Sequence, residues 1–388
     1  MKRYDIAIIG MGGIFPGSKN VEEYWKNVLS GKTFITDMPE KYWRWENFYS
    51  EDKGHTDKTY TKKGSFISDF EFPFEKYRFP PNTWKGVDHA QLIALEATRE
   101  ALEDAGIKPH SSQLDEAITI LGVSGVDNYA HGCVYLRRNN YFERLQDQLR
   151  KNGVSEKIVK ELHTEFEQEV FKRHPVKMFA VGAIPSALSN RVAQVFGAKG
   201  YNMTVDAACA SSFGALETAC HALMAGDARV AITGGVDLGV NPAVYIGFSR
   251  VEGISFSGVA NPFDHTADGL VIGEGGGIVI LKRLEDALAD GDKIKAVIRG
   301  MGSSSDGAGQ AIYNPSVKGR ARAFKMALER AEVSSDDVQF IEAHVTSTVV
   351  GDANEYDAIA AAYVKGRNKN NPLYLGSVKY QIGHLKAA

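Results

Sequence analysis

The sequence has few cysteines, almost no excess charge and no long apolar run. Its 388 residues include three cysteines, Cys133, Cys209 and Cys220, which are too few and too scattered for a disulfide framework or a zinc site. A reducing, cytoplasmic location is therefore expected. The net charge of -3 gives no reason to expect a nucleic-acid partner or a basic membrane-binding patch. No apolar run approaches the roughly 18 residues that a transmembrane helix needs, so no membrane span is expected.

Apolar runs rich in β-branched residues alternate with helical patterns along most of the chain. The first run, residues 4–9, is followed by a glycine-rich turn and is too short for a signal peptide. This alternation predicts an α/β architecture with buried sheets. The other predicted strands are 117–125, 229–237, 275–284, 293–304, 338–344 and 373–379, and the predicted helices are 88–107, 211–225, 316–332 and 352–365.

Two stretches have the character of insertions into this pattern. Residues 33–83 are rich in aromatic, charged and turn residues and show little periodicity. Residues 127–176 carry many charged residues at helical spacing. Such a segment is either a solvated helical cap or a surface for docking or dimer contact, and the sequence leaves both interpretations open.

One cysteine occupies an unusual place, at the join between an apolar run that ends at Val205, predicted to be a strand, and the helix predicted from residue 211. Cys209 lies in VDAACASSFGA, with small neighbours that leave room for an approaching acyl group. A helix N-terminus carries partial positive charge, so the thiolate of Cys209 is expected to be favoured, and its own N–H could face a developing oxyanion. Cys220, within the following helix, and Cys133 are interpreted as structural cysteines.

Other reactive side chains follow two further predicted strands. His344 lies in IEAHVTSTVVGDANE, and Lys379 and His384 lie in LGSVKYQIGHLKAA. In open α/β folds, sites form beyond the carboxyl ends of strands. We therefore expect these side chains to gather around Cys209, which needs a base or a charged partner to act as a nucleophile.

With these motifs the chain resembles a β-ketoacyl synthase, the condensing enzyme of fatty-acid and polyketide assembly. The resemblance covers nearly the whole chain and includes IAIIGMGGIFPGS, VDAACASSFGALETA, NPFDHTADGLVIGEGGGIVILKRLEDAL, IEAHVTSTVVGD and GSVKYQIGHLKAA. EEYWKNVLSGKTFITDMPEKYW, TYTKKGSFI and the charged helical insertion are similar to ketosynthases of polyunsaturated fatty-acid synthases and iterative type I polyketide synthases.

The resemblance implies a thiolase fold. This fold has two similar βαβαβαββ halves in five αβαβα layers. Residues 1–284 would form the half that carries the nucleophile, including both insertions, and residues 285–388 would begin the second half. Family members continue beyond the position of Ala388, so the second half is expected to be C-terminally truncated and the chain poorly active by itself.

The resemblance also implies roles for individual residues. Cys209 matches the nucleophile that accepts the acyl chain. His344 and His384 match the histidines that promote decarboxylation of malonyl and stabilise the enolate and the thioester oxyanion. Lys379 matches the lysine that tunes this cluster, and Glu355 matches the carboxylate partner of that lysine.

Substrates and partners follow from the same resemblance. Thr346 and Thr348 match threonines that hydrogen-bond the phosphopantetheine arm of an acyl carrier protein. No tightly bound cofactor and no metal are implied, because the substrates arrive on that arm. The expected partners are an acyl carrier protein, a second copy in a homodimer, and other domains of a multidomain synthase.

Two residues in the histidine loop depart from the family pattern. Val345 replaces the usual glycine after the first histidine, and Val349 replaces the usual proline. Valine is stiffer than glycine, so the loop path or the pantetheine channel is expected to differ. Two alternatives stay open: a non-condensing partner of the chain-length-factor or decarboxylase type, and a thiolase-like enzyme that uses coenzyme A esters.

Overall fold

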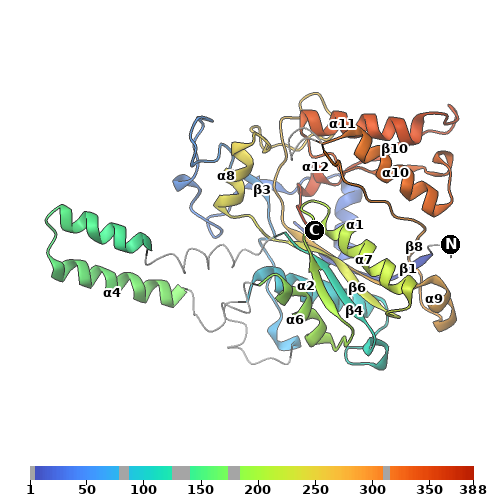
Figure 1. The fold of residues 1–388 in the computed structure, drawn as a ribbon, viewed down its shortest axis with the longest axis horizontal. Helices are drawn as coiled ribbons and strands as arrows, with labels where there is room; N and C mark the ends of the chain where they lie inside the picture. Colours follow the sequence, from blue (N-terminus) through green and yellow to red (C-terminus); the bar gives the residue numbers. More distant parts are fainter. Residues whose placement is uncertain (1–4, 78–86, 125–139, 174–183, 309–314) are drawn as a thin grey trace.

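The structure is a computed structural model that describes residues 5–77, 87–124, 140–173, 184–308 and 315–388. Its main sheet has six strands in the order β5-β4-β6-β7-β1-β8 (Figure 1). β4 runs parallel to both β5 and β6, whereas β7 runs antiparallel to β6 and to β1. The strands are β1 (Ile6–Ile14), β4 (Ile118–Gly122), β5 (Asn202–Val205), β6 (Ala231–Asp237), β7 (Gly275–Arg283) and β8 (Ala296–Ile298).

Helices cover both faces of this sheet. On one face, α2 (His89–Asp104) and α6 (Ser186–Phe196) pack in a core that includes Ile93, Leu188 and Ile232. On the other face, α7 (Ser211–Ala225) packs through small residues such as Ala215 and Ala219 against Ile118 and Ile120. The alternating side chains of the buried strands supply both cores, as expected for a sheet with two covered faces. α9 (Leu284–Asp290) follows β7 directly.

The first strand is longer than its sequence pattern predicts. The expected strand ends at residue 9, where glycines begin, but β1 continues to Ile14 with a bulge between Ile8 and Gly10. The glycines are needed because α2 lies against the strand. A Cβ atom at Gly10 would lie 2.2 Å from the Ala101 carbonyl oxygen, and one at Gly12 would lie 2.0 Å from that of Ala97.

A smaller parallel sheet pairs β9 (Phe340–Glu342) with β10 (Tyr374–Gly376). Because the two strands are parallel, their carboxyl ends lie at the same edge of the sheet. α10 and α11 pack on one another and lie together with this sheet (Figure 1). The helices here are α10 (Val317–Ala331), α11 (Val349–Ile359) and the short α12 (Lys379–Ile382).

Residues 33–77 are integrated into the molecule rather than appended to it. They form the antiparallel pair β2 (Ile35–Asp37) and β3 (Lys63–Ser65). Their aromatic side chains, among them Tyr60 and Phe66, make a third core with Tyr245 of α8 (Pro242–Arg250). Residues 33–77 therefore lack periodicity because their backbone is largely irregular, although their aromatic side chains are part of a core. Residues 78–83 of the predicted insertion lie outside the described residues.

The second predicted insertion is helical where it is described. Residues 140–151 and α4 (Glu156–Arg173) form two helices, and Phe142 stacks on Phe166 with ring centroids 5.0 Å apart. Residues 127–139 and 174–176 lie outside the described residues, as does Cys133.

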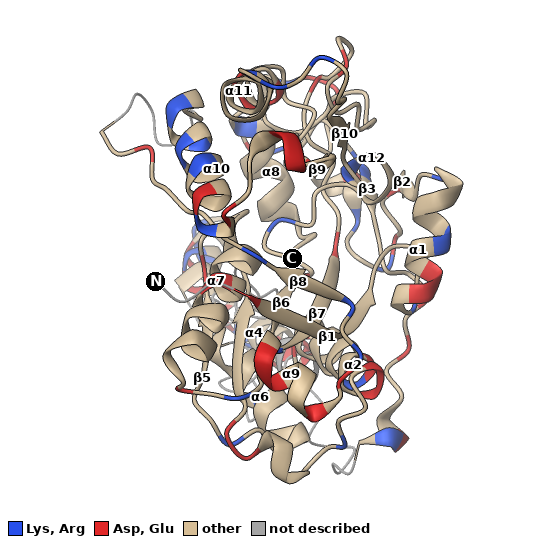
Figure 2. Ribbon diagram, turned by 90° about the vertical axis from the view of Figure 1, so that its right-hand side faces the viewer, with Lys and Arg blue, Asp and Glu red and all other residues tan. Residues whose placement is uncertain are grey.

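Basic and acidic residues are interspersed along the elements of the fold (Figure 2), and the net charge is small. α1 (Val21–Ser30) carries acidic residues in its first turn, where their negative charges interact favourably with the positive end of the helix dipole. In the part of the chain that the structure describes, no helix is both long and apolar enough to cross a membrane.

Candidate active site

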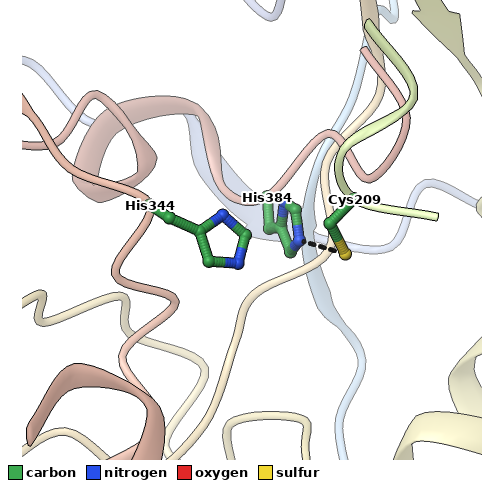
Figure 3. A group of neighbouring side chains, drawn as sticks. All are labelled: Cys209, His344 and His384. Atoms are coloured by element: carbon green, nitrogen blue, oxygen red, sulfur yellow. Dashed lines mark hydrogen bonds between the residues drawn. The ribbon is translucent and has the colours of Figure 1, made fainter. Parts of the chain in front are cut away.

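Three segments that are distant in the sequence bring a thiol and two imidazoles together (Figure 3). Cys209 follows β5, His344 follows β9, and His384 follows α12. The His384 Nε2 atom lies 3.1 Å from the Cys209 sulfur, and the ligand atoms of all three residues lie within 4.8 Å of one another. The two imidazole rings meet edge to face, with centroids 5.3 Å apart and an angle of 84° between planes. The three side chains lie close together as expected, and Cys209 and His344 follow strands, whereas the short helix α12 lies between β10 and His384.

The turn that carries Cys209 is held by one buried serine. The Ser211 hydroxyl accepts a hydrogen bond from the Ala207 N–H at 2.9 Å and donates one to the Ala208 carbonyl at 2.6 Å. Ala208 has φ of 51°, in the left-handed region that non-glycine residues rarely adopt. This tight turn, two residues before α7 begins, presents the sulfur at the join between strand and helix.

The protonation of Cys209 differs from the sequence expectation. Burial of the thiol raises its pKa, although the residue as a whole is exposed. The positive charges of Lys379 and Lys386 act in the opposite direction, and Asp237 raises the pKa further. The helix N-terminus was predicted to favour the thiolate. That prediction was wrong, because burial raises the pKa of the thiol by more than the neighbouring positive charges lower it. At Cys220, within α7, burial raises the pKa to about 12, in keeping with a structural role.

Backbone contacts determine which nitrogen of His384 carries a proton. The Lys386 N–H donates to the His384 Nδ1 at 3.2 Å, so Nδ1 is an acceptor and Nε2 bears the hydrogen in the neutral ring. That hydrogen points to the Cys209 sulfur. Thiol and imidazole are ligand types that zinc binds, but an Nε2 atom that bears hydrogen has no free lone pair for a metal. The arrangement therefore suits a hydrogen-bond donor better than a metal ligand.

Both histidines are neutral at physiological pH. Burial lowers the pKa of His344 to about 4, with further contributions from Lys379 and Arg320. Burial also lowers the pKa of His384 well below its usual value, and His344, Lys379 and Lys386 add to the effect. Lys379 thus contributes to the lowered pKa values of both rings, but burial has the larger effect. Neutral imidazoles can donate a hydrogen bond without titrating during a reaction.

The carboxylate of Glu355 holds the backbone of the histidine loop, which is the segment that carries His344. Its carboxylate accepts hydrogen bonds from the His344 N–H at 2.8 Å and the Val345 N–H at 3.0 Å. Its ion pair is with Arg320, at 3.3 Å. The expected pairing with Lys379 is only an interaction through space, and Glu342 is the stronger charge partner of Lys379. Glu355 therefore acts on Lys379 through space, and its direct contacts are with the loop backbone and Arg320.

The two threonines and the two valines of this loop have separate environments. The hydroxyls of Thr346 and Thr348 lie 3.1 Å apart and are hydrogen-bonded to each other. Val345 is completely buried in a small core with Ala343 and Ile359, so its side chain packs away from the cysteine and histidines. Val349 is exposed at the start of α11. The expected change in the loop path or the pantetheine channel stays a prediction.

Ser347, between the two threonines, is strained. Its φ is 62°, and its buried hydroxyl has no hydrogen-bond partner among the described residues. Left-handed backbone costs a non-glycine residue roughly 1–2 kcal/mol, and a buried unsatisfied hydroxyl costs a similar amount. We expect Ser347→Gly to raise the free energy of unfolding by about 1–2 kcal/mol, after the loss from greater chain entropy. Urea denaturation measures the change.

Glu332 provides the matched control for this substitution. It is exposed at the end of α10 with φ of 54°, so Glu332→Gly relieves backbone strain without removing a buried hydroxyl. The gain at Ser347 should be the larger of the two. Equal gains would mean that the hydroxyl is satisfied in solution.

Sequence reasoning missed three charged residues near the site. Lys386 and Asp237 form a buried ion pair at 2.8 Å behind His384, and Arg320 reaches Glu355 from α10. Lys386 lies two residues after His384 and Asp237 ends a predicted strand, so both positions were visible in the sequence. No spacing rule connects them, because they meet only when the C-terminal segment lies across the end of β6.

Family models account for almost the entire chain. Residues 3–287 match the model described as β-ketoacyl synthase, N-terminal domain, and residues 295–388 match that described as β-ketoacyl synthase, C-terminal domain. One component of the polyunsaturated fatty acid synthase of Thraustochytrium sp. is 34% identical over 98% of this chain. One component of the phenolphthiocerol/phthiocerol polyketide synthase of Mycobacterium bovis is 33% identical over 99% of it. The chain spans only 14% and 19% of the lengths of these two relatives.

Solved structures give the same picture. An oxazolomycin ketosynthase domain from Streptomyces albus superposes with a TM-score of 0.82 at 28% identity, over 99% of this chain and 62% of that one. The ketosynthase from module 6 of the bacillaene synthase of Bacillus subtilis superposes with a TM-score of 0.80 at 27% identity, over 99% and 59%.

Proposed function

Because this chain belongs to the β-ketoacyl synthase family and has its thiolase fold, we propose that it condenses a cysteine-bound acyl chain with a malonyl-carrier thioester. The observation that carries the proposal is the approach of a neutral His384 to the Cys209 sulfur at 3.1 Å, with a second neutral imidazole beside it. A nucleophile with two adjacent N–H donors suits a reaction in which thioester oxygens twice become negative.

The first half-reaction transfers the acyl chain to Cys209. The sulfur attacks the thioester carbonyl, a new carbon–sulfur bond forms, and the carrier thiol leaves with the proton of the Cys209 thiol. Lys379 and Lys386 favour the sulfur anion during this step, and the Nε2–H of His384 stabilises it. The small neighbours Ala208 and Ala210 leave room for the acyl group.

The second half-reaction forms the carbon–carbon bond. The malonyl carboxylate leaves as carbon dioxide, and its electron pair forms an enolate whose oxygen accepts hydrogen bonds from His344 and His384. The enolate carbon then attacks the acyl carbonyl and the Cys209 thiolate departs. The low pKa values of both histidines keep the rings as neutral donors throughout.

The partners of this reaction belong to the same proposal. Thr346 and Thr348 would bind the phosphopantetheine arm of an acyl carrier protein, and the relatives are parts of much longer synthases, which supports neighbouring domains. β5 lies at one edge of the main sheet, and both Met203 within it and Tyr201 directly before it are exposed, which supports pairing with a second copy in a homodimer. The scarcity of cysteine favours a cytoplasmic location.

The division of the chain is also proposed. Residues 1–284 would form the half that carries the nucleophile, and residues 285–388 would begin the second half. The two family matches, over residues 3–287 and 295–388, support a boundary in this region.

Intact mass tests the first half-reaction directly. The purified chain is incubated with an acyl-carrier thioester, beside a Cys209→Ala variant. We expect an acyl adduct on the chain and none on the variant. A matched Cys220→Ala variant should keep the adduct, because Cys220 is fully buried within α7. An adduct that survives in Cys209→Ala would contradict the proposed nucleophile.

A further inference from the structure

A buried ion pair lies directly behind the proposed donor histidine. The Lys386 Nζ atom is 2.8 Å from Asp237 Oδ1, and their side chains are only 8% and 1% exposed. The same ammonium group donates to the Gly273 carbonyl at 3.2 Å. Burial of two charges is expensive unless they are paired and hydrogen-bonded. Both conditions are met, but an apolar pair of similar volume would cost less.

The pair also connects the segments on which His384 depends. Asp237, at the end of β6, accepts hydrogen bonds from the Gly239 N–H at 2.9 Å and the Ala387 N–H at 3.3 Å. Lys386 itself has φ of 55°, and its own N–H donates to the His384 Nδ1. A non-glycine residue held in left-handed backbone beside reactive groups is a pattern that marks functional sites.

From this geometry we propose that Lys386 and Asp237 act as an opposed pair of positioning residues that set the tautomer of His384 and the charge state of Cys209. The Lys386 backbone fixes Nδ1 as an acceptor, which leaves Nε2–H for the sulfur. The positive charge of the ammonium group favours the thiolate form of Cys209, and the negative charge of Asp237 opposes this effect. No sequence motif and no family match assigns either residue this role.

Other ionisable groups surround this pair and must be considered in any pH profile. Lys386 favours the ionised form of Glu274, whose pKa burial raises to about 7. Across the site, Lys379 acts on the thiol and on both imidazoles. The ionisable groups near the pair and the site include His344, Cys209, Lys379, His384 and Glu274. Arg320 acts in turn on His344, and Glu342 and Glu355 act on Lys379.

The test is the pH dependence of Cys209 alkylation by iodoacetamide, followed by peptide mass in the whole chain. Lys386→Met removes the positive charge and keeps the backbone N–H, so the alkylation midpoint should move to higher pH by about half a unit or more. Asp237→Asn removes the negative charge, so the midpoint should move to lower pH. The double variant should return toward the unmodified chain.

Opposite shifts are a result that a purely structural role would not produce. Lys282→Met is the matched control, because Lys282 on β7 is 3% exposed and pairs with Asp290, at the end of α9, and with Asp292, just after it. It should lower thermal stability without moving the midpoint. If Lys386→Met fails to fold, Asp237→Asn and the double variant decide the matter. Shifts in the same direction, or none, would overturn the proposal.

The inference rests on the proposed function only for the importance of Cys209 and His384. Alkylation requires no acyl or malonyl substrate. A chain that shows opposite shifts but no acyl adduct would contradict the proposed function and retain this inference. A chain that forms the adduct but shows no shifts would support the proposed function and overturn this inference.

Discussion

Replacing His344 with alanine is expected to lower the rate of condensation by about 10²–10³-fold while leaving the acylation of Cys209 within a few-fold of normal. The reason is geometric. His384, not His344, is in hydrogen-bond contact with the sulfur, at 3.1 Å. His344 lies beside it, where an enolate oxygen could be bound by both rings. Release of carbon dioxide from malonyl-carrier thioester measures the second half-reaction, and intact mass measures the first.

Two further histidine variants give this prediction its contrast. His384→Ala should impair both half-reactions, because the same ring contacts the sulfur and the enolate. His265→Ala should impair neither, since its side chain is 91% exposed. An equal loss of acylation in His344→Ala and His384→Ala would contradict the division of roles between the two rings.

The proximity of Cys209, His344 and His384 could be predicted because local patterns carry all three residues. Each follows an apolar run that predicts a strand, and the carboxyl ends of parallel strands share an edge. β9 and β10 are parallel, so His344 and the segment containing Lys379 emerge together. The length of the first strand, in contrast, was predicted wrongly, because the glycines after residue 9 were interpreted as a turn. Its glycines are demanded by the contact with α2, which is a tertiary effect that no local pattern reports.

The electrostatics of the site could not be predicted, because they depend on burial and on pairs that are distant in the sequence. A helix N-terminus favours a thiolate, yet desolvation raises the pKa of Cys209. Glu355 was linked with Lys379, yet its carboxylate is occupied by the loop backbone and by Arg320. In each case the partners were decided by the packing of α7, α10 and α12.

Glu355→Ala is expected to lower the free energy of unfolding by about 3–5 kcal/mol, because it breaks a buried ion pair and leaves two backbone donors without a partner. Glu355 is 4% exposed, so water does not readily replace its oxygens. The His344 and Val345 N–H groups lose their acceptor, and Arg320 loses its charge partner. Urea denaturation measures the loss, and condensation should fall with it because His344 is no longer held.

Glu217→Ala is the matched control, because it breaks a different ion pair and leaves the backbone hydrogen bonds of the histidine loop in place. Glu217 pairs with Arg330 at 3.0 Å and is 16% exposed, but no backbone N–H of the histidine loop depends on it. Its loss should cost about 1–2 kcal/mol and leave condensation unchanged. Arg320→Met tests the remaining contribution, since it removes the ion pair and keeps both N–H bonds to Glu355. If Arg320→Met proves as destabilising as Glu355→Ala, the carboxylate matters mainly as a charge. If it costs much less, the main work of Glu355 is to hold the backbone that carries His344.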